Sequence, residues 1–136
     1  MKTLGLRHVA LNVRNAQLSK KFYCEVLKMQ VEWEPDPKSI YLTSDNQDNL
    51  ALHQADAPLH KPGSLNHIGF FVLTPEEVEA WHTHVEFHLP EYNAKIVKWL
   101  EAHRDGARSF YFEDPDGNII QLLYHPPISR GISELV

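Results

Sequence analysis

Three histidines and a glutamine lie in short alternating segments where their side chains could bind a metal ion. His8 and His67 hold the same place in two similar segments, and His53 and Gln121 each follow an apolar residue in a later segment. Successive side chains of a strand point to opposite faces, so these polar groups lie on the face opposite to their apolar neighbours. Imidazole is a common ligand of zinc, nickel and iron, and an amide oxygen is a weaker one. The pattern predicts a divalent metal site made of these four residues.

Each histidine taken alone also fits a hydrogen-bonded structural role in a half-apolar strand. Two histidines at equivalent positions of a repeat favour ligation, because repeat symmetry makes them neighbours. The repeat is the likeness of residues 6–13 to residues 65–72, in which Leu, His and the final Val coincide. Both segments read as strands by their alternation.

A helix signal follows each of these segments. Asn15 can cap the first helix, and Thr74 with Glu77 forms a capping box in which Pro75 takes the first helical position. Three strand-like stretches follow each helix: residues 30–34, 39–43, 49–54, 94–101, 107–113 and 118–124. Each half therefore reads as strand–helix–strand–strand–strand, which predicts an α+β fold.

The length of 136 residues fits one domain, residues 1–136, made of two modules. The modules are predicted at residues 4–54 and 65–125, with a linker at 55–64 that contains two prolines and a glycine. Residues 126–136 read as an irregular C-terminal arm. Each half is too small to be convincing as an independent domain.

Composition excludes several kinds of partner. The net charge is −5 and the sequence has no basic stripe, which argues against nucleic acid and anionic membranes. No apolar run is long enough for a bilayer, and no signal-peptide core follows the N-terminus. The single cysteine, Cys24, excludes an internal disulfide framework and a cysteine-based zinc site, so we expect a cytosolic protein.

Four pieces of the sequence resemble the vicinal oxygen chelate superfamily, also called the glyoxalase/bleomycin resistance/extradiol dioxygenase group. The pieces are Leu6–Val13, Phe22–Met29, Leu65–Phe70 and Ser109–Leu122, and the last contains Phe-Glu-Asp-Pro-Asp-Gly-Asn. The resemblance implies paired βαβββ modules that form an open, incomplete barrel around a divalent metal (zinc, nickel, iron or manganese). It also implies a small-molecule substrate and a homodimer.

The resemblance places His8 and His67 at the family's ligand positions in the first strand of each module. His53 falls where glyoxalase I-like members often have glutamate, and Gln121 falls where most active members have glutamate. The resulting ligand set is neutral, so a bound divalent ion keeps its full charge and favours anionic chelating substrates. The set lacks the carboxylate of the iron dioxygenase triad, and also the metal-bound glutamate that moves protons in glyoxalase-type isomerisation.

Other side chains are candidates for contacts with a substrate. Tyr111 and His103 are candidate proton donors, Arg108 could grip an anionic group, and Phe71 and Trp99 could form an aromatic wall. The alternatives are core or interface packing for the aromatic residues and a polar turn for the segment around His103.

Three functions remain open at this point: a metal-dependent enzyme of the lyase, isomerase or dioxygenase type, a metal-free module that sequesters a ligand at a dimer interface, and a ligand sensor without turnover. His84 and His88, at i and i+4 of the second helix, could clip a surface metal or form a solvated face. Cys24 fits packing better than nucleophilic chemistry.

Overall fold

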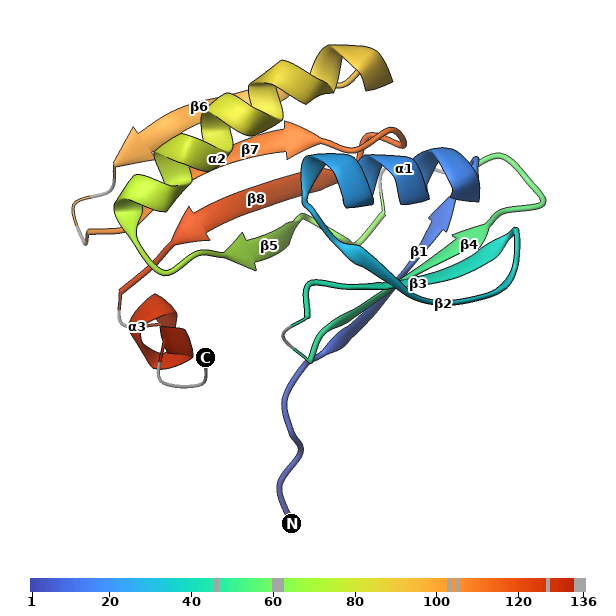
Figure 1. Cartoon of the computed structure of the whole chain (residues 1–136), viewed down its shortest axis with the longest axis horizontal. Coiled ribbons are helices and arrows are strands. Elements are labelled where there is room, and N and C mark those ends of the chain that lie inside the picture. The colour runs from blue at the N-terminus through green and yellow to red at the C-terminus, as the bar shows by residue number, and fades with distance from the viewer. Residues whose placement is uncertain (46, 60–62, 103, 105, 127, 134–136) are drawn as a thin grey trace. The chain divides into compact units, whose positions relative to one another are not determined.

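The computed structural model describes residues 1–45, 47–59, 63–102, 104, 106–126 and 128–133. The chain divides into two compact units, Met1–Gly63 and Ser64–Val136. Each unit has the order strand, helix and three strands, and each contains an open four-stranded mixed sheet (Figure 1). The α+β fold predicted from the sequence is confirmed. Among the described residues, no helix has the length and apolar character needed to span a membrane.

The first unit forms a sheet in the order β1-β4-β3-β2, with helix α1 packed on it. β1 runs parallel to β4, and the other neighbours are antiparallel. The bounds are β1 His8–Val13, α1 Ala16–Val26, β2 Gln30–Asp36, β3 Ser39–Thr43 and β4 Asn49–Gln54. α1 begins where Asn15 Oδ1 accepts a 3.0 Å hydrogen bond from the Leu18 amide, as the sequence predicts for an N-cap.

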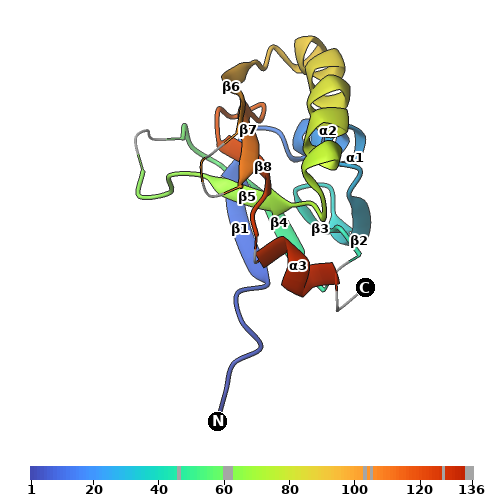
Figure 2. The ribbon, with the colours of Figure 1, turned by 90° about the vertical axis from the view of Figure 1, so that its left-hand side faces the viewer.

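The second unit repeats this topology with the order β5-β8-β7-β6 and with helix α2 against β6, β7 and β8. Figure 2 views these strands nearly edge-on, with α2 on one side of them. The bounds are β5 Ile68–Phe71, α2 Pro75–His88, the 3-10 helix η1 Leu89–Tyr92, β6 Ile96–Ala102, β7 Arg108–Glu113, β8 Ile119–Tyr124 and α3 Ile128–Ser133. The expected capping box at Thr74 and Glu77 is present.

Alternation gives each sheet one apolar face, which packs on the helix of its own unit. The fully buried side chains of the sheets include Val13, Ile40, Leu42 and Leu52 in the first unit, and Phe110, Phe112, Ile120 and Leu122 in the second; those of the helices include Phe22 of α1 and Val78 and Val85 of α2. The opposite face of each sheet carries the polar and aromatic residues between them in sequence, and we call it the open face.

The C-terminal segment differs from the irregular arm expected from the sequence, because Ile128–Ser133 forms the short helix α3. The Ser129 amide donates to the His125 carbonyl at 2.8 Å, and the His125 amide donates to Ser129 Oγ at 2.9 Å. These two local bonds begin a helical turn that has no hydrophobic period long enough to be recognised in the sequence.

The turn between β7 and β8 depends on one buried carboxylate. Asp114 Oδ1 accepts from the amides of Asp116 and Asn118 at 2.9 and 2.8 Å, and Asp114 Oδ2 accepts from Asn118 Nδ2 at 2.9 Å. Gly117 has φ 77°, a conformation in which a side chain would be strained. The turn fixes the register of the β7–β8 pair.

Asp114→Ala should lower the free energy of unfolding by about 3 kcal/mol, because it leaves two amides of the turn without their acceptor. Urea denaturation followed by circular dichroism measures the change. Asp36→Ala is the matched control, since Asp36 accepts one bond, from the exposed Lys38 amide at 2.8 Å. The control should cost less than about 1 kcal/mol. Equal losses in the two variants would contradict the role given to Asp114.

Candidate functional site

His8 lies at the start of β1 on the open face of the first sheet, and Asn49 of β4 is its partner in register. His8 Nδ1 lies 2.6 Å from Asn49 Oδ1, and Asn49 Nδ2 donates to Glu32 Oε2 at 2.8 Å. The bond to Glu32 sets the orientation of the Asn49 amide, so its oxygen faces the imidazole. His8 must then donate from Nδ1, and its Nε2 carries the lone pair that a metal needs.

His67, just before β5 in the second unit, has the same arrangement. Its Nδ1 lies 2.6 Å from Oδ1 of Asn66, an amide oxygen that can only accept. The proton therefore sits on Nδ1 and the lone pair sits on Nε2. The two histidines that match in the sequence repeat thus share one tautomer, fixed by asparagine in each case.

Gln121 lies on the open face of the second sheet. It is opposite Gly69 in the parallel β5–β8 pair, two positions along β5 from His67. Gln121 Oε1 lies 3.9 Å from the point where a Cβ on Gly69 would be. The side chain of Leu123 lies closer to the same point, with Cδ2 at 3.2 Å, so an apolar group borders the amide of Gln121 on this face.

The register of the first sheet separates His53 from His8. His8 is paired with Asn49, and His53 is paired with Asn12. Four residues along a strand correspond to roughly 13 Å, so these two side chains are not brought together. The position that corresponds to Gln121 in the repeat is instead Ala51, the partner of Ala10 in register.

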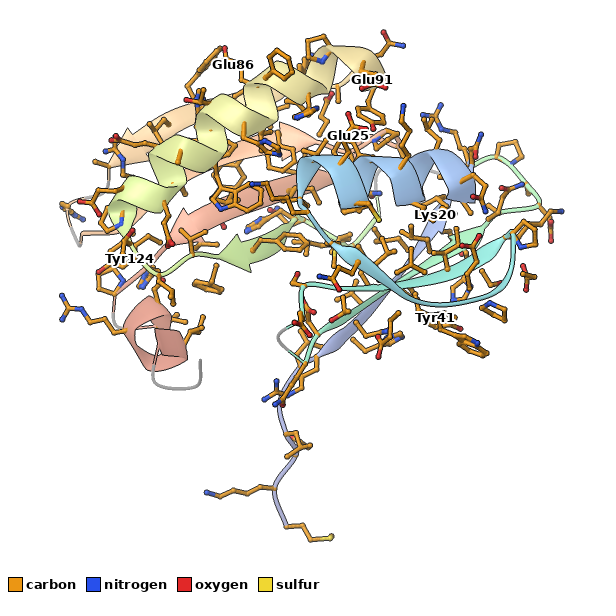
Figure 3. The ribbon with its side chains drawn as sticks, in the orientation of Figure 1. Lys20, Glu25, Tyr41, Glu86, Glu91 and Tyr124 are labelled. Carbon is orange, nitrogen blue, oxygen red and sulfur yellow. The ribbon has the colours of Figure 1, made fainter. Side chains whose placement is uncertain are left out.

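His53 belongs to an aromatic row that crosses the open face of the first sheet. The Trp33 and Tyr41 rings stack at 5.2 Å, and the Tyr41 and His53 rings meet edge to face at 5.8 Å. Figure 3 shows Tyr41 on the side of the sheet away from α1. Trp33 is 60% exposed, so the row offers an apolar platform to a ligand.

Tyr111, expected to be a proton donor, lies on the open face of β7 opposite Gln121. Its ring meets the His67 ring edge to face at 5.4 Å. Lys98, opposite Tyr111 in β6, places its Nζ 5.7 Å from the centre of the Tyr111 ring. The second unit therefore brings an imidazole, an amide, a phenol and an ammonium group together on one face.

The residues expected to contact a substrate are divided between the two faces of this sheet. Phe71 is 41% exposed and shares the open face with Gly69. Trp99 lies against His82 of α2, with ring centres 5.4 Å apart, and Arg108 forms an ion pair with Glu79 of α2. Neither Trp99 nor Arg108 is brought to the open face.

Two further residues singled out in the sequence are His103 and Cys24. His103 lies outside the described residues. Cys24 in α1 is half-buried, and burial raises the pKa of its thiol, although the charge of Lys20 opposes this shift. A raised pKa leaves less thiolate at neutral pH, so Cys24 is a poor nucleophile, in agreement with a packing role.

Sequence reasoning missed Asn49, Asn66, Glu32 and Lys98. Asn66 directly precedes His67, so a signal for it was present in the sequence. Asn49 and Glu32 reach His8 only through strand pairing, which no local spacing reveals.

Each open face, taken by itself, carries side chains whose chemistry suits a divalent metal ion. His8 and His67 have the tautomer that a ligand needs, and Gln121 offers an amide oxygen. An imidazole nitrogen and an amide oxygen are donors that suit zinc, nickel, iron or manganese. The absence of a carboxylate among these three residues separates the set from the usual triad of iron dioxygenases.

Comparison with known proteins agrees with this description. A model of the Glyoxalase/Bleomycin resistance protein/Dioxygenase superfamily matches residues 5–122. The chain is 28% identical over 131 residues to biphenyl-2,3-diol 1,2-dioxygenase 3 of Rhodococcus globerulus, a match that covers 88% of this chain and 63% of that protein.

Solved structures share the fold. A glyoxalase-related enzyme from Fulvimarina pelagi matches with a TM-score of 0.74 and 19% identity, over 91% of this chain and 90% of that one. A fosfomycin resistance protein from Listeria monocytogenes matches with a TM-score of 0.73 and 18% identity, over 95% and 97%. The chain belongs to the glyoxalase/bleomycin resistance protein/dioxygenase superfamily.

Proposed function

We propose that this protein is a divalent-metal-dependent enzyme acting on a small anionic substrate that has two adjacent oxygens. The family resemblance supports His8, His67 and Gln121 as the residues that would hold the metal. The observation that carries the proposal is the pair of 2.6 Å hydrogen bonds in which an asparagine oxygen accepts from Nδ1 of each histidine, which leaves Nε2 of each ready to bind. Three protein ligands with further positions open are typical of catalytic rather than structural sites.

We do not propose His53 as a ligand, because the register of β1 and β4 separates it from His8. We assign His53 to the aromatic row with Trp33 and Tyr41, as a surface for the apolar part of a substrate. The family resemblance also supports a homodimer, and the single cysteine suits a reducing compartment such as the cytosol.

A metal held by neutral ligands supplies a strong Lewis acid for the substrate oxygens. The chain's own residues add binding and proton transfer. Lys98, whose Nζ lies 3.2 Å from Glu101 Oε2, would exchange this exposed ion pair for the negative charge of the substrate. The Tyr111 hydroxyl would donate a proton to an oxygen as charge develops on it. Phe71 would exclude water beside them. This arrangement favours a lyase or isomerase acting through an enolate or oxyanion.

The test is elemental analysis of tag-free protein and of single histidine variants. We expect one zinc, nickel, iron or manganese ion per site in the wild type, and its loss in both His8→Ala and His67→Ala. His53→Ala is the matched control, because it removes an imidazole from the same open face but outside the proposed ligand set. It should keep the metal.

Each outcome has a clear meaning. Loss of metal in His53→Ala would overturn the three-residue ligand set. No metal in the wild type, even after loading with each ion, would overturn the enzyme proposal. The second candidate, a metal-free module that sequesters a ligand, is favoured by one observation, the exposed Trp33 stacked on Tyr41. Ligand-induced thermal shifts that are lost in Trp33→Ala would then support it.

A further inference from the structure

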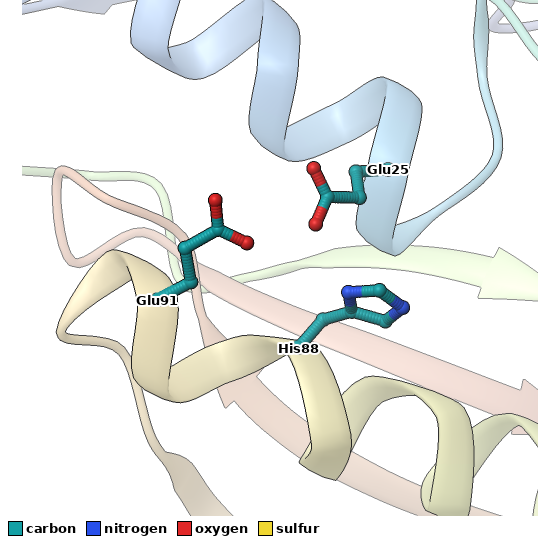
Figure 4. A group of neighbouring side chains, drawn as sticks. All are labelled: Glu25, His88 and Glu91. Atoms are coloured by element: carbon teal, nitrogen blue, oxygen red, sulfur yellow. The ribbon is translucent and has the colours of Figure 1, made fainter.

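The last turn of α2 and the following η1 helix carry a second group of metal-ligand side chains. His84 and His88 are one helical turn apart, and their ring centres are 4.6 Å apart. Glu91 follows in η1, and a ligand atom of His88 lies within 4.8 Å of one of its carboxylate oxygens (Figure 4). Figure 4 also draws Glu25, which belongs to the first unit.

We propose that His84, His88 and Glu91 form a second transition-metal site, distinct from the ligands named above. Two imidazoles at i and i+4 can bind one ion without any change in the helix backbone. The carboxylate adds a negative charge that the first site lacks. Two nitrogens and one oxygen suit zinc, nickel or copper(II), and do not suit calcium or magnesium.

The position in the helix adds a favourable field. The carbonyl groups at the C-terminal end of a helix carry partial negative charge, which stabilises a cation in the last turn. His84 and His88 are half-exposed and Glu91 is exposed, so an ion can reach them without unfolding. Because the ion ties the last turn of α2 to η1, its binding should reduce fraying of this helix end.

The experiment uses the full chain with His8→Ala and His67→Ala as background, which removes the first proposed site. Calorimetric titration with zinc should give about one site per chain. His88→Ala and Glu91→Gln should each weaken zinc binding. Loss of a side chain that only hydrogen-bonds to a ligand costs roughly 10- to 100-fold in metal affinity, and His88→Ala should cost more than this. His88→Gln, which keeps a polar side chain, should weaken binding similarly if His88→Ala is unstable.

Glu86→Gln is the matched control for Glu91→Gln. Glu86 is a carboxylate on the same helix whose partner is His82, with Nδ1 to Oε2 at 3.8 Å, and it points outward in Figure 3. Zinc affinity should stay within about twofold of the background. A second readout is amide hydrogen exchange, which zinc should slow in the last turn of α2.

No zinc binding in this background would overturn the proposal, as would affinity unchanged in His88→Ala or equal losses in Glu86→Gln and Glu91→Gln. The proposal is independent of the proposed function. Failure of the first site would appear as unchanged metal content in His8→Ala and His67→Ala. Failure of the second site would appear as no zinc binding in the background that lacks both histidines, or as unchanged affinity in the helix variants.

Discussion

Gln121→Glu is expected to tighten metal binding by about 100-fold, because it places a negative charge at ligand distance in a set that is otherwise neutral. The two side chains have nearly the same shape. Gln121 Oε1 lies 3.9 Å from the point where a Cβ on Gly69 would be, and a glutamate can place a carboxylate oxygen in the same position. The substitution should therefore change the charge of the ligand set without repacking the sheet.

Competition with a chromophoric chelator measures this change in zinc affinity. Gln30→Glu is the control, because it makes the same chemical change at an exposed residue of β2 in the first sheet. If Gln30→Glu tightened binding as much, the effect would be one of net charge. If Gln121→Glu bound zinc no better than the wild type, Gln121 would not be a ligand.

Local signals in the sequence predicted most of the fold. The helix starts followed from side chains that cap their own backbone, Asn15 for α1 and Thr74 with Glu77 for α2. The strands Ser39–Thr43 and Asn49–Gln54 have the predicted bounds, because turn residues interrupt the alternation on both sides. These features depend on neighbours within a few residues, so the printed sequence contains them.

The face of each candidate residue could be predicted where alternation was regular. Tyr111 and Gln121 lie on the open face as expected. Trp99 does not, because the pairing of β6 with β7 shifts on both sides of Lys98 and moves Trp99 to the α2 side. Such a bulge leaves no mark in the pattern of apolar residues. Alternation places Arg108 on the same face of β7 as Phe110, which is the face that α2 covers. The ion pair of Arg108 with Glu79 of α2 agrees with this placement.

The neighbours across strands could not be predicted. Alternation says which face His53 takes but not which residue of β1 it meets, and the register places it opposite Asn12 instead of near His8. The same pairing brings Asn49 to His8. Register depends on the packing of the whole sheet, so the distance of His53 from His8 could not be predicted from faces alone.

Phe110→Ala should lower the free energy of unfolding by about 4 kcal/mol, the typical cost of removing a fully buried phenylalanine. Phe110 is 0% exposed, and its ring meets the rings of His82 of α2 at 4.9 Å and of Phe112 at 5.6 Å. Truncation would leave a cavity beneath α2 that these stiff rings cannot fill. Urea denaturation measures the loss.

Phe87→Ala is the control for this prediction, because Phe87 is a phenylalanine of α2 in the same unit but is 80% exposed. It should change stability by less than about 0.5 kcal/mol. Similar losses in the two variants would mean that α2 does not pack as described. Phe110 directly precedes Tyr111 in β7, and the ring centres of Tyr111 and His67 are 5.4 Å apart. A shift of β7 into the cavity would therefore move the phenol of Tyr111 away from His67. The same core that stabilises the second unit therefore holds the proposed proton donor in place.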